Sequence, residues 1–325
     1  IAKMMQALAP HLQGAEEGLL KELQTEGCRH DVEEIGQNWP QTVFGYTALD
    51  LATAPSRIDS LLVIENTEKA LLDGLRSIRG FVPHYVTEPA ESPVLAAGIG
   101  LNLEKIVPFL TERQAAIARK QYSCSFLKEM QETANPQQSA ALAMATGMAP
   151  GVQGLAFSLL SLDLEAAEAD TTPMPKNIDA LISLAVKDPV SLVQMISAFF
   201  PPLAQLQFPT DGTPVQLPLP IQLPFPVMAA INGSHLTVYA GEKSQALAEG
   251  LRSEALDASG GLIATEIDYG KYYGLIGATL AGETQQEEDV KAVLDAMKKV
   301  KMRLRMNLDV TERGLEMKMD MIATE

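Results

Sequence analysis

The residues of this chain with the most specific chemistry are its two cysteines and four histidines. The only local cluster of metal-ligand types is Cys28-x-His30-Asp31, and a Cys and a His two positions apart need two further ligands from elsewhere to hold zinc. Residues two positions apart on a helix also point in different directions, so His30 is poorly placed to activate the Cys28 thiol as a nucleophile. We therefore predict no metal, no cofactor and no thiol catalysis at this cluster.

Other catalytic motifs are missing from the sequence. It contains no Gly-x-x-x-x-Gly-Lys-Ser/Thr phosphate loop and no Gly-x-Ser-x-Gly nucleophile elbow, and Gly98-Ile99-Gly100 lacks the rest of a dinucleotide fingerprint. The remaining histidines, His11, His84 and His235, are far apart along the chain. Any catalytic site would therefore have to be assembled from residues dispersed in the sequence.

The two cysteines, Cys28 and Cys124, each begin a similar amphipathic segment. An even number of cysteines in an exported protein favours a disulfide, which would stabilise a loop of this length by about 4–5 kcal/mol in the chain-entropy model. The alternative is a pair of unrelated buried thiols, which are common in protein cores.

The methionines are unevenly distributed, since six of the fourteen fall between Met297 and Met321. Methionine adapts to many apolar shapes and is frequent on promiscuous hydrophobic surfaces. The pattern is compatible with an apolar groove for a lipid, a peptide or a protein partner, or with an ordinary core beneath a helix such as 287–300. The candidate groove residues are Met302, Met306, Met317, Met319 and Met321.

The end of the chain gives the clearest structural prediction. Apolar and polar residues alternate strictly over 302–310 and again over 315–321, which indicates two strands with one buried and one solvated face. A loop at 311–314 would place Val310 opposite Leu315 and Arg305 opposite Asp320. Apolar residues then pair on one face, and oppositely charged residues pair on the other. We therefore predict an antiparallel hairpin here.

Similar hairpins, usually followed by a helix, are expected at 43–64, 155–186 and 227–239, the last through the type I′ turn dipeptide Asn232-Gly233. The segment from Ile58 to Ser77 recurs weakly from Ile178 to Ser197, and 99–106 resembles 265–272. These patterns predict an α+β protein of two pseudo-repeated halves, built on antiparallel sheets of hairpin–helix units with helices on one face.

We expect an N-terminal helical segment at 1–40, a first half at 41–166 and a second half at 167–325. The second half includes a Pro-rich strap at 201–226 that packs on the protein along one side.

The composition excludes several kinds of partner. The 325 residues carry a net charge of −16, and no basic cluster is large enough to bind nucleic-acid phosphates against that charge. No run of apolar residues is long enough to predict a transmembrane helix. The sequence starts at Ile1 inside an expected helix, which is compatible with a signal peptide or a lipid anchor upstream.

The recurring strand–turn–strand–helix pattern resembles that of uncharacterised bacterial envelope proteins and lipoproteins of the domain-of-unknown-function type. The stretches that carry this resemblance, under a third of the chain, are Phe225 to Leu251, Gly261 to Leu275 and Met302 to Ala323. The resemblance implies export and a noncatalytic role, and it transfers no functional residue.

The leading hypothesis is therefore a noncatalytic binding or interaction protein of the cell envelope, periplasmic or attached to the outer membrane. Its expected partner is a hydrophobic small molecule or a protein. The alternatives are a hydrolase with a dispersed site and a structural scaffold that oligomerises. A large apolar cavity would favour binding, a pocket with a histidine near a serine or cysteine would favour hydrolysis, and a broad flat apolar patch would favour a scaffold.

Overall fold

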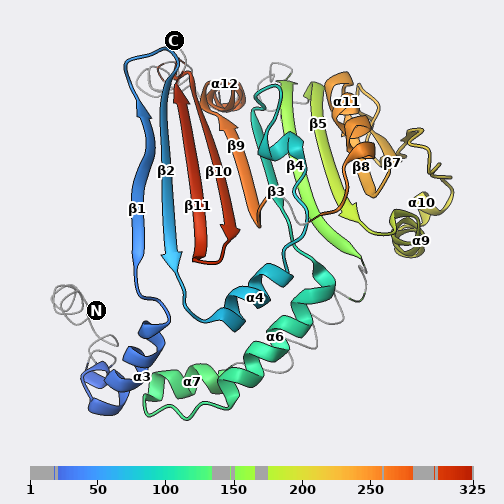
Figure 1. Ribbon diagram of the computed structural model, residues 1–325. Helices are drawn as coiled ribbons and strands as arrows, with labels where there is room; N and C mark the ends of the chain where they lie inside the picture. Colours follow the sequence, from blue (N-terminus) through green and yellow to red (C-terminus); the bar gives the residue numbers. More distant parts are fainter. Residues whose placement is uncertain are drawn as a thin grey trace.

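The computed structural model describes residues 21–133, 151–164, 175–257, 260–280 and 299–323, with Gly18, Gly147 and Ala296 as single positions. Its centre is one antiparallel sheet of eleven strands (Figure 1). The strands are β1 (Thr42–Asp50), β2 (Ser56–Glu65), β3 (Leu95–Ile99), β4 (Val152–Leu164), β5 (Pro175–Val186), β6 (Val215–Gln216), β7 (Met228–Asn232), β8 (His235–Ala240), β9 (Ile263–Asp268), β10 (Met302–Val310) and β11 (Gly314–Ala323).

The helices connect these strands and continue from their ends. They are α3 (Glu26–Gln37), α4 (Lys69–Ser77), α5 (His84–Thr87), α6 (Leu103–Ala118), α7 (Ser125–Thr133), α9 (Pro189–Phe199), α10 (Pro201–Ala204), α11 (Glu242–Gly250) and α12 (Tyr269–Leu280), with a short 3-10 helix at Leu251–Ser253. The predicted α+β class with antiparallel pairing is confirmed, and the strands form a single sheet rather than several.

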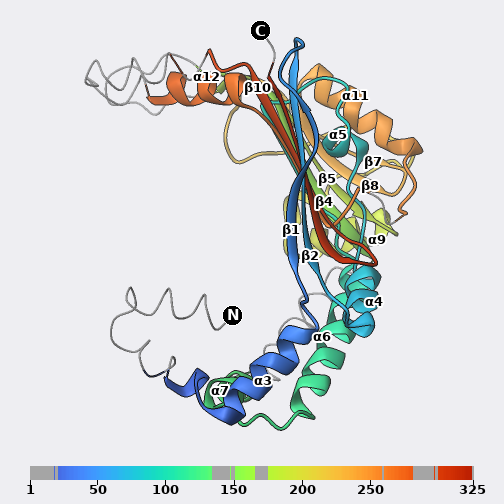
Figure 2. The same cartoon turned by 60° about the vertical axis from the view of Figure 1, so that its left-hand side comes forward.

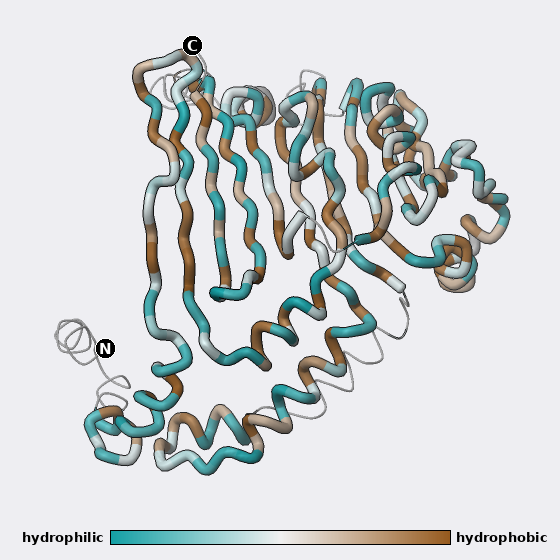
Figure 3. The backbone as a smooth tube through the Cα atoms, viewed as in Figure 1, coloured by the Kyte–Doolittle hydropathy of each residue, from teal (hydrophilic) through white to brown (hydrophobic). Residues whose placement is uncertain are grey.

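The terminal hairpin has the predicted register. Val310 pairs with Leu315 and Arg305 pairs with Asp320 across β10 and β11. Along both strands hydrophilic and hydrophobic residues alternate (Figure 3). The Asn232-Gly233 turn also forms as predicted, with Gly233 at a φ of 60°, a conformation that glycine adopts without strain.

The strand order joins hairpins that are far apart in the sequence. It runs β1-β2-β11-β10-β9-β3-β4-β5-β8-β7-β6, so that β3 and β9 form a central pair. The first hairpin pairs with the last through β2 and β11, and the hairpin of β4 and β5 pairs with that of β7 and β8. Both predicted halves therefore contribute strands to the same sheet, and the boundary at 167 remains a prediction.

Helices pack against both faces of the sheet. On one face, α5 and α11 cover a buried cluster that includes Val86, Leu181 and Leu251. On the other face, α9 places Leu192 and Met195 against Leu184, which lies on the opposite side of β5 from Leu181. The predicted packing of all helices on one face is therefore not confirmed. Figure 2 shows the sheet nearly edge-on. In this view α12 lies at one end of the strands and the group of α3, α6 and α7 at the other, and both project away from α5 and α11.

The segment 115–133 contributes to two helices, because α6 ends at Ala118 and α7 begins at Ser125. In the Pro-rich strap, β6 pairs with β7, and Val215, Leu217 and Phe225 are half-buried, whereas Leu219 and Ile221 are exposed. Most of the helix expected at 287–300, and residues 1–17, lie outside the described residues.

Candidate functional site

The most extensive chemical feature of the sheet is its apolar face on the side away from α5 and α11, which we call the open face. Because strands pair in register, open-face residues form rows that cross the whole sheet. One row joins ten apolar residues from β1 to β7: Phe44, Leu62, Met317, Leu308, Ile263, Ile99, Leu155, Leu184, Leu236 and Ile231.

The two neighbouring rows have the same character. Their polar members are Ser60 and Thr265, and every other position is apolar. The first row consists of Tyr46, Ser60, Met319, Met306, Thr265, Ala97, Phe157, Ile182, Val238 and Ala229, and the second of Leu49, Ile58, Met321, Leu304, Ile267, Leu95, Leu159, Ala180 and Ala240.

Much of this apolar surface remains accessible to solvent. Large open-face side chains at the β1 edge and in the middle of the sheet are between 44% and 64% exposed: Phe44, Tyr46, Leu49, Ile99, Leu155 and Ile182. A contiguous apolar surface of this extent is unusual on a protein, and surfaces of this kind are frequent at interaction sites. Because α9 covers the Leu184 and Leu236 corner, the exposed part lies over β1, β3, β4 and the middle of β5.

All five methionines of the predicted groove lie on the open face. Met302 and Met306 come from β10, and the other three, Met317, Met319 and Met321, come from β11; each is half-buried. Their neighbours extend the apolar surface in both directions, through β2 to β1 and through β9 to β5. The methionines thus form one part of a surface several times wider than the predicted groove.

The opposite face of the same strands is polar around a buried carboxylate. Glu266 of β9 is fully buried and accepts a hydrogen bond of 2.8 Å from Arg305 Nε, while Arg303 lies 3.7 Å from its other oxygen. The row continues through Asp320 to Asp59, which pairs with Arg57 at 2.7 Å. These strands therefore separate an ionic network on one face from an apolar surface on the other.

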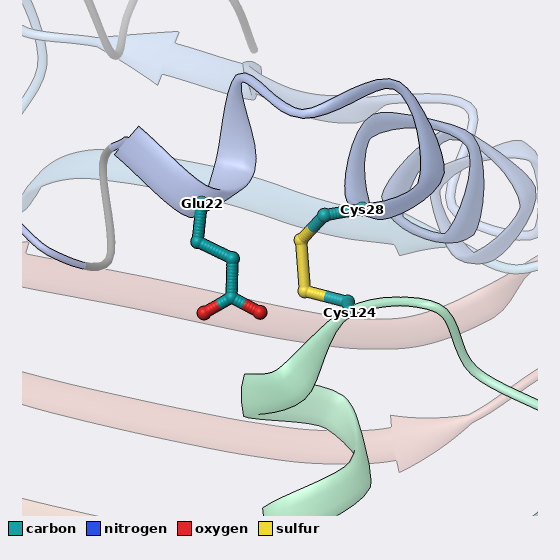
Figure 4. A group of neighbouring side chains, drawn as sticks. All are labelled: Glu22, Cys28 and Cys124. Carbon is teal, nitrogen blue, oxygen red and sulfur yellow. A yellow bond between two sulfur atoms is a disulfide. The ribbon is translucent and has the colours of Figure 1, made fainter.

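Cys28 and Cys124 form a disulfide, the first of the two alternatives for this pair (Figure 4). Asp31 accepts hydrogen bonds of 2.6 Å and 2.8 Å from the backbone N–H groups of Ser123 and Cys124. The disulfide and these bonds join α3 to the start of α7.

The Glu22 carboxylate lies close to both sulfur atoms. It accepts hydrogen bonds from the Ser125 hydroxyl and backbone and from the Phe126 N–H, and the Ser125 hydroxyl is the main reason its pKa is lowered. Because both thiols are consumed in the disulfide, Cys28 and Cys124 offer no thiolate to a metal. With Glu22 they instead hold α3 against the start of α7.

The three histidines in the described part of the chain are dispersed, and His11 lies outside it. His30 is exposed on α3, and His235 is buried beside Phe81, with ring centroids 5.2 Å apart. His84 lies with Ser253 in a pocket of about 580 Å³, and its Nδ1 is 3.3 Å from Glu254. The Ser253 hydroxyl, however, donates its proton to the Gly250 carbonyl, which differs from the serine–histidine contact of a hydrolase.

Comparison with known proteins finds no match: no family model, no curated protein and no solved structure is similar to this chain. The disulfide fits a protein outside the cytoplasm, since disulfides form and persist in oxidising compartments. Among the described residues, no helix combines the length and the apolar character that crossing a bilayer requires.

Proposed function

We propose that this protein is a noncatalytic binding protein of the bacterial cell envelope that holds the acyl chain of a hydrophobic ligand on its open face. The observation that carries the proposal is the continuity of apolar residues across the sheet, with the middle of the face still exposed at Ile99, Leu155 and Ile182. Covering such a surface with an apolar ligand stabilises the complex by about 25 cal/mol for each Å² removed from water.

An acyl chain suits this surface better than a second copy of the chain. Stacked sheets approach to about 10 Å, but α12 and the group of α3, α6 and α7 project on the open-face side at both ends of the strands (Figure 2). A thin, flexible chain can lie between these projections, whereas a second sheet would collide with them. Two copies would also repel each other, since each carries a net charge of −16. These points favour ligand binding over an oligomerising scaffold.

The location in the envelope is supported by the disulfide, which needs an oxidising compartment to persist. A periplasmic or outer-membrane-attached protein with an open apolar face would bind lipids or lipid-modified proteins in the compartment where they are exchanged. The net charge of −16 disfavours an anionic membrane surface as the partner and is consistent with binding individual molecules.

We also propose that the fold arose by duplication of one unit. The first copy would be β1, β2, α4, β3, α6, β4 and β5, and the second β7, β8, α11, β9, α12, β10 and β11. This division moves the boundary from 167 to a point after β5 and leaves the edge strand β6 outside both copies. The strand order supports this, because it is symmetric about the β3–β9 pair, and so does the resemblance of 99–106 to 265–272. The match between 58–77 and 178–197 does not follow this symmetry, since it aligns β2 with β5.

The test is binding of Nile red, an uncharged apolar dye, to the full chain and two matched variants. Ile99→Glu places a charge in the middle of the open face, and Ile221→Glu places the same charge at an exposed isoleucine of the Pro-rich strap. We expect Ile99→Glu to weaken dye binding at least about tenfold, because a charge in an apolar site must be desolvated. Equal binding by both variants, with circular dichroism showing both folded, would contradict the proposal.

A further inference from the structure

β1 is the outermost strand at one end of the sheet, and among the described residues it pairs only with β2 (Figure 1). The Gln41 carbonyl accepts the Glu65 N–H at 3.0 Å, so every second residue from Gln41 onward points its backbone groups at β2. The residues between them, Thr42, Phe44 and Tyr46, therefore direct their N–H and C=O groups away from β2. A further strand could pair with these groups.

The same residues carry exposed apolar side chains at this end of the open face. Phe44 and Tyr46 are 55% and 64% exposed, and their rings contact edge to face with centroids 5.6 Å apart. A strand that paired with this edge would place its own alternate side chains beside these rings on the open face. The edge thus offers backbone hydrogen bonds and apolar contacts along one line.

β1 lacks most of the features by which proteins block exposed sheet edges. It has nine residues with no lysine, arginine or proline, and its one charged side chain is Asp50 at its end. A bulge between Tyr46 and Ala48 interrupts the pairing with β2 and leaves Thr42 to Tyr46 as regular strand. Unprotected edges of this kind are templates for another strand.

The other end of the sheet shows which kind of segment covers such an edge. The outer edge of β7 is occupied by β6 of the Pro-rich strap, and the Leu217 N–H donates to the Val227 carbonyl at 2.9 Å. Val215 pairs with Ala229, an open-face residue. Val215 and Leu217 are half-buried, whereas Gln216 between them is exposed. An extended segment with apolar residues at alternate positions therefore fits an edge of this sheet.

We propose that β1 binds an extended segment of a partner protein as an added strand, with the alternate apolar side chains of that segment on the open face. The segment is neutral or basic, because this chain carries a net charge of −16 and β1 contributes only Asp50. The same charge disfavours a second copy of this chain as the partner. The inference does not depend on acyl-chain binding, since backbone hydrogen bonds supply the attachment.

The test uses an end-capped synthetic heptapeptide with valine at its second, fourth and sixth positions, glutamine between the valines and lysine at both ends. In an added antiparallel strand with the valines on the open face, the valine N–H groups point toward β1 and the glutamine N–H groups point away. We expect N-methylation of the three valines to weaken binding to the full chain at least about tenfold, because it removes the donors that face β1. N-methylation of the two glutamines should leave the affinity nearly unchanged, and fluorescence anisotropy of labelled peptides measures both.

Two substitutions at one residue test the edge from the side of the protein. Phe44→Pro and Phe44→Ala both remove the ring, but only proline also removes the N–H that points away from β2. We expect Phe44→Pro to weaken peptide binding well beyond Phe44→Ala. In the unmodified protein, the peptide should slow hydrogen exchange over residues 42–46.

Equal affinities of the three peptides would overturn strand addition, because binding would then not need the backbone donors. Failure of all three peptides to bind would overturn it as well. A dimer of the unmodified protein that Phe44→Pro dissociates, detected by sedimentation velocity, would assign the edge to a second copy of the chain and overturn the assignment to a partner segment.

Discussion

Lys318 and Met319 are consecutive in β11 and lie on opposite faces of the sheet. Lys318 pairs with Asn307 on the polar face, and Met319 pairs with Met306 on the open face. Arg303 and Arg305 of β10 and Glu266 of β9 lie on the same polar face, as do Arg57 and Asp59 of β2. A single layer of strands therefore separates an ionic network from an apolar surface. An antiparallel sheet commonly has one face packed on a core and the other solvated and polar, so an apolar face that stays exposed is unusual.

The two neighbouring residues provide a matched test of that separation. Met319→Glu and Lys318→Gln each lower the net charge by one, but they change different faces. We expect octyl glucoside, below its micelle concentration, to raise the melting temperature of the unmodified protein and of Lys318→Gln, since a ligand that binds the native state stabilises it. The shift should be lost in Met319→Glu. Equal shifts in the two variants, measured by scanning calorimetry, would argue against binding at the open face.

The buried ion pair should respond asymmetrically to removal of its partners. Glu266 is fully buried, whereas Arg305 is partly exposed. Arg305→Gln leaves a buried carboxylate with only the more distant Arg303 and is expected to cost about 3–5 kcal/mol of unfolding free energy. Glu266→Gln should cost less, because water can reach the arginine that remains. The double variant should recover part of the loss, as expected for coupled partners, and urea unfolding of all three variants measures it. A larger loss in Glu266→Gln than in Arg305→Gln would contradict this account.

Stability should fall as the pH drops below neutrality because of His235. Burial lowers the pKa of its ring, an effect opposed by the charge of Glu254. The folded protein therefore holds the neutral ring, and the unfolded chain takes up a proton first as pH falls through about 6.5. The resulting stability is fully present above that pH and is lost below it. His235→Leu should flatten this part of the urea-midpoint profile between pH 7.5 and 5, and an unchanged slope would count against it.

Reduction of the disulfide should loosen the helices it joins before it affects the sheet. The bond links α3 to α7 across 96 residues, and in the chain-entropy model such a link contributes about 4–5 kcal/mol. We expect the Cys28→Ser, Cys124→Ser double variant to show faster hydrogen exchange in both helices, while the central strands β3 and β9 stay protected. Unchanged exchange in α3 and α7 would show that the carboxylate contacts of Asp31 and Glu22 suffice to hold them.

The terminal hairpin could be predicted from sequence in detail because its register is a local property. Strict alternation and the turn length determine that Val310 meets Leu315, and no distant residue is needed. The start of α9 is also a local feature, because Asp188 accepts the Ser191 N–H as an N-cap residue and Pro189 follows it. The interruption between α6 and α7 could not be predicted, because no proline or glycine marks it. The disulfide and the bonds from Asp31 fix the turn at Ser123 and Cys124 instead.

The open face is a property of the strand order, which is why the sequence revealed only its methionine portion. Ile99, Leu155 and Ile182 belong to three strands whose apolar residues are equally compatible with a buried core. Their exposure becomes evident only when pairing through β3 and β9 joins the strands in one sheet with helices elsewhere.

The most direct test of the central claim is photo-crosslinking of the full chain with palmitate that carries a photoreactive diazirine in its chain, followed by peptide mapping. The account predicts crosslinks concentrated on open-face residues of β3, β4, β10 and β11, such as Leu155 and Met306. Palmitate in excess should compete them away. Crosslinks confined to exposed apolar residues elsewhere, such as Phe126 and Met130 of α7 or Ile221 of the strap, would contradict the claim that the open face is the binding surface.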